Sequence, residues 1–153
     1  MFRIDADLKE FVESGVAGLV GTGDGDARPC CAYGWAPRVG ADGGTIDVFL
    51  DAERSEPTLS NLKANGRVAM TLADPVSYRS VQLKGTFRES GEPDEADREW
   101  VQRQREAFLT ATTLIGDPPA VVRNAWLDDV VRVTFAPEVA FDQTPGPGAG
   151  KPL

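Results

Sequence analysis

Apolar and polar residues alternate one by one along much of this chain, which is the pattern of β-strands that bury one face. In residues 80–90 (SVQLKGTFRES), Val81 and Leu83 share one face, while Gln82 and Lys84 share the other. Segments of this kind are predicted to be strands at residues 16–22, 30–39, 45–50, 67–73, 80–90 and 130–136. Stretches rich in Gly and Asp between several of them indicate hairpin turns.

Elsewhere the apolar spacing changes to three and four residues, which predicts helices. Residues 5–14 form the first predicted helix. Residues 56–65 form the second, with Pro57 in its first turn and Gly66 just after its end.

A long helix is expected over residues 93–115, and a further one is expected to follow Asp117, which can cap it. The apolar stripe of the long helix would consist of Ala96, Trp100, Ala107, Ala111 and Leu114. Trp126 is expected to pack on the face of the further helix, and the neighbouring acids Asp128 and Asp129 are expected to be solvated.

Six antiparallel strands leave two exposed edges unless the sheet closes on itself, which favours a small barrel over an open sheet. The prediction is therefore a mainly β fold with flanking helices, built on a six-stranded antiparallel barrel. A length of 153 residues suits one domain, which we place at residues 1–141. Residues 142–153 (DQTPGPGAGKPL) are rich in Pro and Gly and are expected to form an extended or poorly ordered tail.

Charge and hydropathy restrict the classes of partner. Asp and Glu number 24 against 16 Lys and Arg, so the net charge is -8, which repels nucleic acid and anionic membrane surfaces. The apolar stretches are strand-sized, well short of the ~20 residues of a membrane helix. The N-terminal residues MFRIDADLKEF lack the apolar core of a signal peptide. We expect a cytoplasmic protein with neither a nucleic-acid nor a membrane partner.

The chain has no histidine, which excludes histidine general bases, histidine-ligated haem and most zinc sites. We therefore expect no bound metal. The two cysteines, Cys30 and Cys31, are adjacent and would point to opposite faces of a strand, so a disulfide between them would be strained. Both are expected to be small buried apolar residues.

The order GTIDVFLDAERSEPTLSNLKANGRVAMTL followed by YRSVQLKGTF resembles the core of the pyridoxamine 5'-phosphate oxidase family. The resemblance covers residues 16–88 and extends weakly to the last strand. It includes a strand that leads into Arg54, Ser55 and a capped helix. It also rests on spaced residues in that helix and in a later strand: Leu59, Asn61, Leu62 and Asn65, then Arg79, Val81, Leu83 and Gly85.

The resemblance implies a six-stranded split barrel that forms a homodimer, with flavin mononucleotide (FMN) in a cleft between the subunits. The family's phosphate-binding Ser-Arg-Lys segment falls on Ser55, Glu56 and Pro57, so only the serine is kept. Arg54, one residue earlier, can replace the missing cations. The hydroxyl of Thr58 and the N–H groups at the start of the helix can also contact a phosphate.

Four further residues occupy family positions near the flavin ring or ribityl chain, or share their face: Arg79, Ser80, Gln82 and Lys84. The alternative is that these four are solvated strand positions, that Ser55 is only a helix cap, and that Thr58 is an exposed helix residue. Trp35 can pack on a ring or a partner subunit, although the core is the commoner place for it. Gln143 and the tail can fold over the cleft.

The vitamin B6 oxidase itself uses a C-terminal Arg-x-His element, whereas this chain has no histidine and ends in FDQTPGPGAGKPL. We therefore expect a relative of that enzyme with another substrate. Three functions remain open at this point: an FMN-binding protein or flavin-dependent oxidoreductase, a barrel that binds a deazaflavin coenzyme, and a cofactor-free binding or structural dimer.

Overall fold

The computed structural model describes residues 2–125 and 129–153. Within these ranges it contains strands β1 (Ala17–Gly23), β2 (Pro29–Val39), β3 (Ile46–Asp51), β4 (Arg67–Ala73), β5 (Ser80–Gly91) and β6 (Val130–Asp142), and helices α1 (Ala6–Val12), α2 (Glu56–Asn65), α3 (Glu95–Leu114) and α4 (Pro119–Ala125). The expectations for Trp126 and Asp128 fall outside the described residues. None of the helices in the described ranges is both long and apolar enough to span a bilayer.

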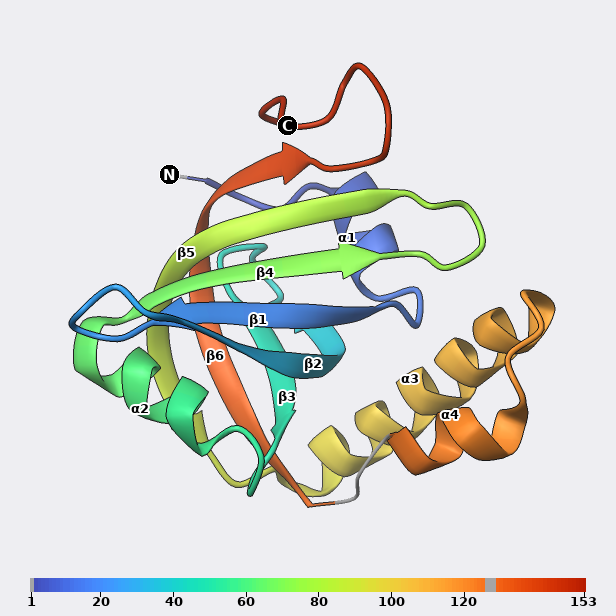
Figure 1. Cartoon of the computed structure of the whole chain (residues 1–153), viewed down its shortest axis with the longest axis horizontal. Coiled ribbons are helices and arrows are strands. Elements are labelled where there is room, and N and C mark those ends of the chain that lie inside the picture. The colour runs from blue at the N-terminus through green and yellow to red at the C-terminus, as the bar shows by residue number, and fades with distance from the viewer. Residues whose placement is uncertain (1, 126–128) are drawn as a thin grey trace.

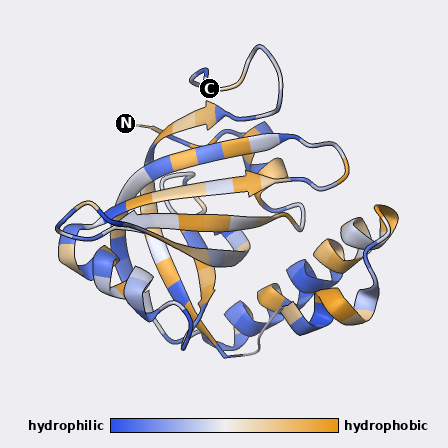
Figure 2. Ribbon diagram, in the orientation of Figure 1, coloured by the Kyte–Doolittle hydropathy of each residue, from blue (hydrophilic) through white to orange (hydrophobic). Residues whose placement is uncertain are grey.

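The strands form a closed antiparallel barrel in the order β1-β2-β3-β6-β5-β4 (Figure 1). This confirms the predicted six-stranded antiparallel barrel with flanking helices. Apolar and polar residues alternate as bands along the strands in Figure 2, as expected for strands with one buried face. The fully buried side chains inside the barrel include Val20, Ile46, Val48, Met70, Leu72, Leu83 and Phe135.

The longest strands, β5 and β6, bend as they cross the molecule. Their register shifts between Lys84 and Gly85, and again between Phe87 and Glu89. A Cβ atom at Gly85 would lie 2.1 Å from the carbonyl oxygen of Ala136, so this close approach requires glycine. Pro137 lies opposite Gly85, where the ladder is already irregular, and the strand therefore continues past it to Asp142 instead of ending near Ala136 as predicted.

The predicted apolar stripe of α3 is wrong at its two ends, whereas its middle residues Trp100, Ala107 and Ala111 are partly buried. Ala96 is exposed, and Leu114 is 74% exposed. The buried residues of α3 are instead Asp97, Val101, Gln104, Leu109 and Thr112. The reason is that the face with Asp97, Val101 and Gln104 is turned toward the rest of the fold, whereas Ala96 is turned to solvent and Leu114 lies at the exposed end of the helix (Figure 1).

Polar contacts attach the buried face of α3 to the barrel. Asp97 takes part in a capping box with Asp94, and its side chain is only 2% exposed. Its two carboxylate oxygens accept hydrogen bonds from Arg38 on β2 at 2.5 Å and from Arg132 on β6 at 3.0 Å. Arg38 also donates to Asp47 on β3 at 2.8 Å. One helix carboxylate thus joins two strands that flank β3.

The Asp97 carboxyl is more acidic than usual in the folded protein. Burial alone would raise its pKa, but the hydrogen bonds from Arg38 and from the Asp94 N–H, together with the positive charges of Arg38 and Arg132, outweigh burial and lower it. The ionised form is therefore the one that stabilises the fold.

The C-terminal residues fold back onto the barrel. The Gln143 N–H donates to the Ser80 carbonyl at 2.8 Å, and the Leu153 N–H donates to the Ala140 carbonyl at 2.9 Å. Phe141 and Pro152 form an isolated antiparallel bridge. The expectation of an extended or poorly ordered tail is therefore wrong, because backbone hydrogen bonds to β5 and β6 hold these residues. The division of the chain after residue 141 remains a prediction.

Replacing Asp97 with Asn should lower the free energy of unfolding by about 2–3 kcal/mol at pH 7, because two largely buried guanidinium groups lose their shared counter-charge. The folded-state pKa is lowered, so this contribution is complete above the unfolded-state pKa of about 4 and is lost as the pH falls through the folded value. Urea unfolding of both proteins at pH 7 and near pH 3 measures the effect.

The difference between wild type and Asp97→Asn should shrink at the acidic pH, because the carboxyl takes up a proton more readily in the unfolded state than in the folded state. Asp117→Asn, at an exposed position, is the matched control and should leave stability nearly unchanged. An equal difference at both pH values would contradict the ionic account of this contact.

Candidate functional site

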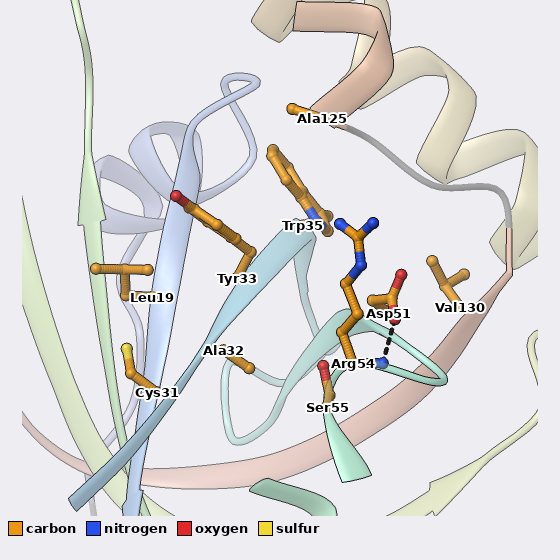
Figure 3. Close-up of a pocket in the computed structure, with 10 residues that line it drawn as sticks. All are labelled: Leu19, Cys31, Ala32, Tyr33, Trp35, Asp51, Arg54, Ser55, Ala125 and Val130. Atoms are coloured by element: carbon orange, nitrogen blue, oxygen red, sulfur yellow. Dashed lines mark hydrogen bonds between the residues drawn. The ribbon is translucent and has the colours of Figure 1, made fainter. Parts of the chain in front are cut away.

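A cleft opens where β2, the end of β3 and the start of α2 meet (Figure 3). Its volume is about 280 Å³. The described residues that line it are Leu19, Cys31, Ala32, Tyr33, Trp35, Asp51, Arg54, Ser55, Ala125 and Val130. Below, "the cleft" means the space that these ten residues line.

Two aromatic rings form one wall of the cleft. The rings of Tyr33 and Trp35 lie 5.6 Å apart with 23° between their planes, so they are stacked. Trp35 also meets the ring of Phe108 on α3 edge to face at 5.7 Å. Tyr33 is 66% exposed whereas Trp35 is 5% exposed. The wall is therefore firmly packed at Trp35 and open at Tyr33, which leaves a flat surface for another ring.

The opposite side of the cleft is polar and lies at the start of α2. Among the described lining residues Arg54 is the only cation, and Figure 3 shows its guanidinium extending toward Trp35. The Arg54 backbone N–H donates to the side chain of Asp51. This hydrogen bond lies in the turn that connects β3 with α2. The cleft thus contains the Asp51 carboxylate as well as the Arg54 guanidinium, and the carboxylate reduces the net positive charge at this end.

Ser55 occupies the N-cap position of α2, but its side chain makes no capping hydrogen bond. The residue is only 3% exposed, and its hydroxyl makes no hydrogen bond with any other described residue. A buried hydroxyl without a partner is uncommon, because desolvating it costs free energy. This hydroxyl lines the cleft, where a bound polar group would satisfy it.

Thr58 does not line the cleft and is only 1% exposed, so the alternative of a solvent-exposed helix residue is wrong. Its hydroxyl lies 3.5 Å from the sulfur of Cys30. The reason is that α2 packs this side against β1 and β2. Its hydroxyl is therefore directed to the interior, one helical turn beyond Ser55.

Gln82 and Lys84 lie on the outer face of the sheet. The Gln82 amide donates to Thr71 at 3.0 Å. Strand pairing places Gln82, Thr71, Leu19 and Tyr33 in one row across β5, β4, β1 and β2. Gln82 thus shares a face with the aromatic wall but stands three strands from it, about 14 Å at the usual strand spacing.

A second, shallower hollow on this outer face has a volume of about 900 Å³ and shares Cys31 with the cleft. Lys84 and Arg67 line it from neighbouring strands, together with the small residues Gly21 and Ala69. The Lys84 ammonium lies 5.2 Å from the ring centre of Phe141. Lys84 therefore faces this hollow rather than the cleft.

Arg79 and Ser80 also lie outside the cleft of a single chain. Arg79 forms an ion pair with Asp7 at 2.7 Å and lies over the ring of Phe11, both on α1. The Ser80 hydroxyl donates to the Tyr78 carbonyl at 3.0 Å, and its N–H donates to Thr144 at 3.1 Å. Of the seven residues that the resemblance relates to the cofactor, the structure therefore brings only Arg54 and Ser55 together in the cleft.

Comparison with known proteins now assigns the family. The family model described as pyridoxamine 5'-phosphate oxidase matches residues 4–140. The chain belongs to the pyridoxamine 5'-phosphate oxidase family. Among curated proteins, none matches the chain.

Solved structures share the fold of this family member at low sequence identity. An F420 reductase has a TM-score of 0.55 and 21% identity over 86% of this chain and 94% of its own. An FMN-binding protein from Syntrophomonas wolfei has a TM-score of 0.53 and 14% identity over 90% and 87%. A conserved hypothetical protein from Mycobacterium tuberculosis has a TM-score of 0.60 and 22% identity over 90% and 82%. These similarities support the split-barrel fold.

Sequence reasoning missed several cleft residues of this family member. Tyr33 and Cys31 lie on the exposed outer face of β2, and Asp51 ends β3. Cys31 is exposed and Cys30 is half-buried, so the expectation that both cysteines are buried is wrong. Cys31, Tyr33 and Trp35 follow each other at every second position, which was the available signal for a common face. No group of three or more potential metal ligands occurs among the described residues.

Proposed function

We propose that this family member binds a flavin-type cofactor in the cleft, with FMN as the first candidate. The observation that carries the proposal is the buried Ser55 hydroxyl, which has no hydrogen-bond partner among the described residues and lies beside Arg54, opposite a flat aromatic wall. A flavin matches both sides, since its ring system can stack on Tyr33 and its phosphate can accept hydrogen bonds from the start of α2.

The start of α2 provides a limited set of phosphate donors. Pro57 has no N–H, so the backbone donors of the first turn are those of Glu56 and Thr58. The Arg54 guanidinium and the Ser55 hydroxyl complete the set. Because the family's two further cations are replaced by Glu56 and Pro57, we infer that this phosphate site is weaker than the family pattern provides.

A bound flavin would supply the redox chemistry by accepting and donating a hydride. The protein's own residues would bind and orient it. Trp35 and Tyr33 would fix the ring plane, and Arg54 would hold the phosphate end. Cofactor contacts by Arg79, Ser80, Gln82 and Lys84 would require a second subunit that brings these residues to the cleft of the first.

A deazaflavin coenzyme is the second candidate. Glu56 stands at a position where the family pattern has a cation, which disfavours the doubly charged phosphate of FMN. A similar fold occurs in an F420 reductase. The same aromatic wall accommodates either ring system, so the charge at the phosphate end is what separates the two ligands. A cofactor-free dimer is the remaining alternative if neither ligand binds.

We also propose that the protein forms a homodimer through the outer face around the cleft. Leu19 and Tyr33 lie side by side on this face and are 46% and 66% exposed, and Cys31 is exposed next to them. Exposed apolar side chains of this kind are favoured in interfaces, where each partner buries about 800 Å². A second copy seated here would cover the open side of the cleft. A cytoplasmic location remains a prediction.

The phosphate placement is tested by titrating FMN and riboflavin against wild type, Arg54→Ala and Glu56→Lys, with flavin fluorescence as the readout. Arg54→Ala should weaken FMN binding by about tenfold to a hundredfold, because one charge-assisted hydrogen bond is lost. Riboflavin, which has no phosphate, should change little. Glu56→Lys should strengthen FMN binding because it restores a family-like cation.

Arg88→Ala is the matched control, since Arg88 is exposed and does not line the cleft. It should leave both affinities unchanged. If neither flavin binds even Glu56→Lys, the flavin proposal is wrong. If FMN binds wild type and Arg54→Ala equally, the placement of its phosphate is wrong.

The dimer is tested by light scattering, which should give about twice the chain mass of 16.4 kDa. Leu19→Lys should shift the protein toward monomer, because it places a charge in the centre of the apolar face. The Cys31 thiol should then react faster with a soluble disulfide reagent. Leu153→Lys, a similar change at a residue 60% exposed, should remain dimeric. A wild-type monomer at micromolar concentration would overturn this proposal.

A further inference from the structure

Strand β2 contains an irregularity directly after the aromatic wall of the cleft. Its pairing with β3 shifts register between Trp35 and Arg38. Within this bulge Ala36 has a φ of 48° and is fully buried. A left-handed backbone is unfavourable for alanine, so surrounding contacts must hold it. The bulge interrupts the alternation of the strand, and the four residues 34–37 are all buried.

Helix α3 holds this bulge at both ends. The indole N–H of Trp100 donates to the carbonyl of Ala36 at 2.9 Å, across 64 positions in sequence. At the other end, Arg38 is bound by Asp97 on the same helix. Trp100 and Asp97 lie three residues apart, so one face of α3 makes both contacts.

The bulge and the helix together determine where Trp35 lies. Trp35, Ala36 and Val101 belong to one small core cluster between β2 and α3, and Trp100 and Phe108 pack against it. The Phe108 ring meets Trp35 edge to face. Trp35 therefore has α3 behind it and the stacked ring of Tyr33 in front, and a relaxed bulge would displace the wall of the cleft.

We propose that Trp100 is a positioning residue for the cleft. By holding the Ala36 carbonyl, it keeps the strained bulge that sets the plane of Trp35, and thereby of a ring bound against that wall. Asp97 supports the same bulge through Arg38. This inference rests on the proposed function for its effect on ligand binding, but the placement of Trp35 can be measured without a ligand.

The experiment compares Trp100→Phe, Ala36→Gly and the double variant. Trp100→Phe keeps the ring but removes the N–H donor, so the bulge should relax. Glycine adopts the left-handed backbone readily, so in Ala36→Gly the bulge does not need the hydrogen bond from Trp100. The substitution should therefore restore the bulge when the Trp100 indole is absent. Incorporated 5-fluorotryptophan reports the position of Trp35 in the free protein, and Trp35→Phe identifies its ¹⁹F signal.

The Trp35 signal should move in Trp100→Phe and return toward its wild-type position in the double variant. FMN affinity, used as the second readout, should fall by about tenfold in Trp100→Phe, the effect of one buried hydrogen bond, and recover in the double variant. Ala36→Gly alone should resemble wild type. A purely structural role of Trp100 would not be relieved by Ala36→Gly.

An unmoved Trp35 signal in a folded Trp100→Phe would overturn the inference. So would a loss of FMN affinity, or a loss of folding, that Ala36→Gly does not recover. If wild type binds no FMN but the ¹⁹F signals behave as expected, the proposed function fails while the positioning of Trp35 by Trp100 stands.

Discussion

Closure of the sheet between β5 and β6 is the constraint on which the other features depend. These two strands are paired along most of their length, and their backbones approach closely at Gly85. The carbonyl of Ala136 occupies the space that a side chain at position 85 would need, so this pairing requires glycine there. Closure also fixes the neighbours of β3, which lies between β2 and β6. The end of β3, the start of α2 and the outer face of β2 then meet, and the cleft forms at their junction.

The positions of the strands could be predicted from the sequence because side-chain alternation is a local property. Val48 and Leu83, for example, point into the barrel as their patterns indicated. The buried face of α3 could not be predicted in the same way, since it is built around Asp97, and hydropathy patterns treat a carboxylate as exposed. Its burial depends on Arg38 and Arg132, which lie 59 and 35 positions away.

The candidate site shows the same division between local and distant information. Arg54 and Ser55 were predictable because the turn from a strand into a capped helix is a short motif. The exposure of Tyr33 and the burial of Thr58 were not, because each depends on which element covers the residue. The left-handed backbone of Ala36 gave no signal in sequence either, since alanine is common in ordinary strands and helices and the contact that holds it comes from Trp100.

The carboxylate of Asp97 forms ion pairs with two guanidinium groups on different strands, and this constrains how the sequence can evolve. Loss of the acid alone removes the counter-charge that Arg38 and Arg132 share and leaves Asp47 as a partner of Arg38, and loss of one cation leaves the acid only half compensated. The residues at 38, 97 and 132 are therefore energetically coupled, and their effects are not additive. Sequence drift at these positions should be concerted, with the acid and both cations retained or replaced together by apolar residues of similar volume.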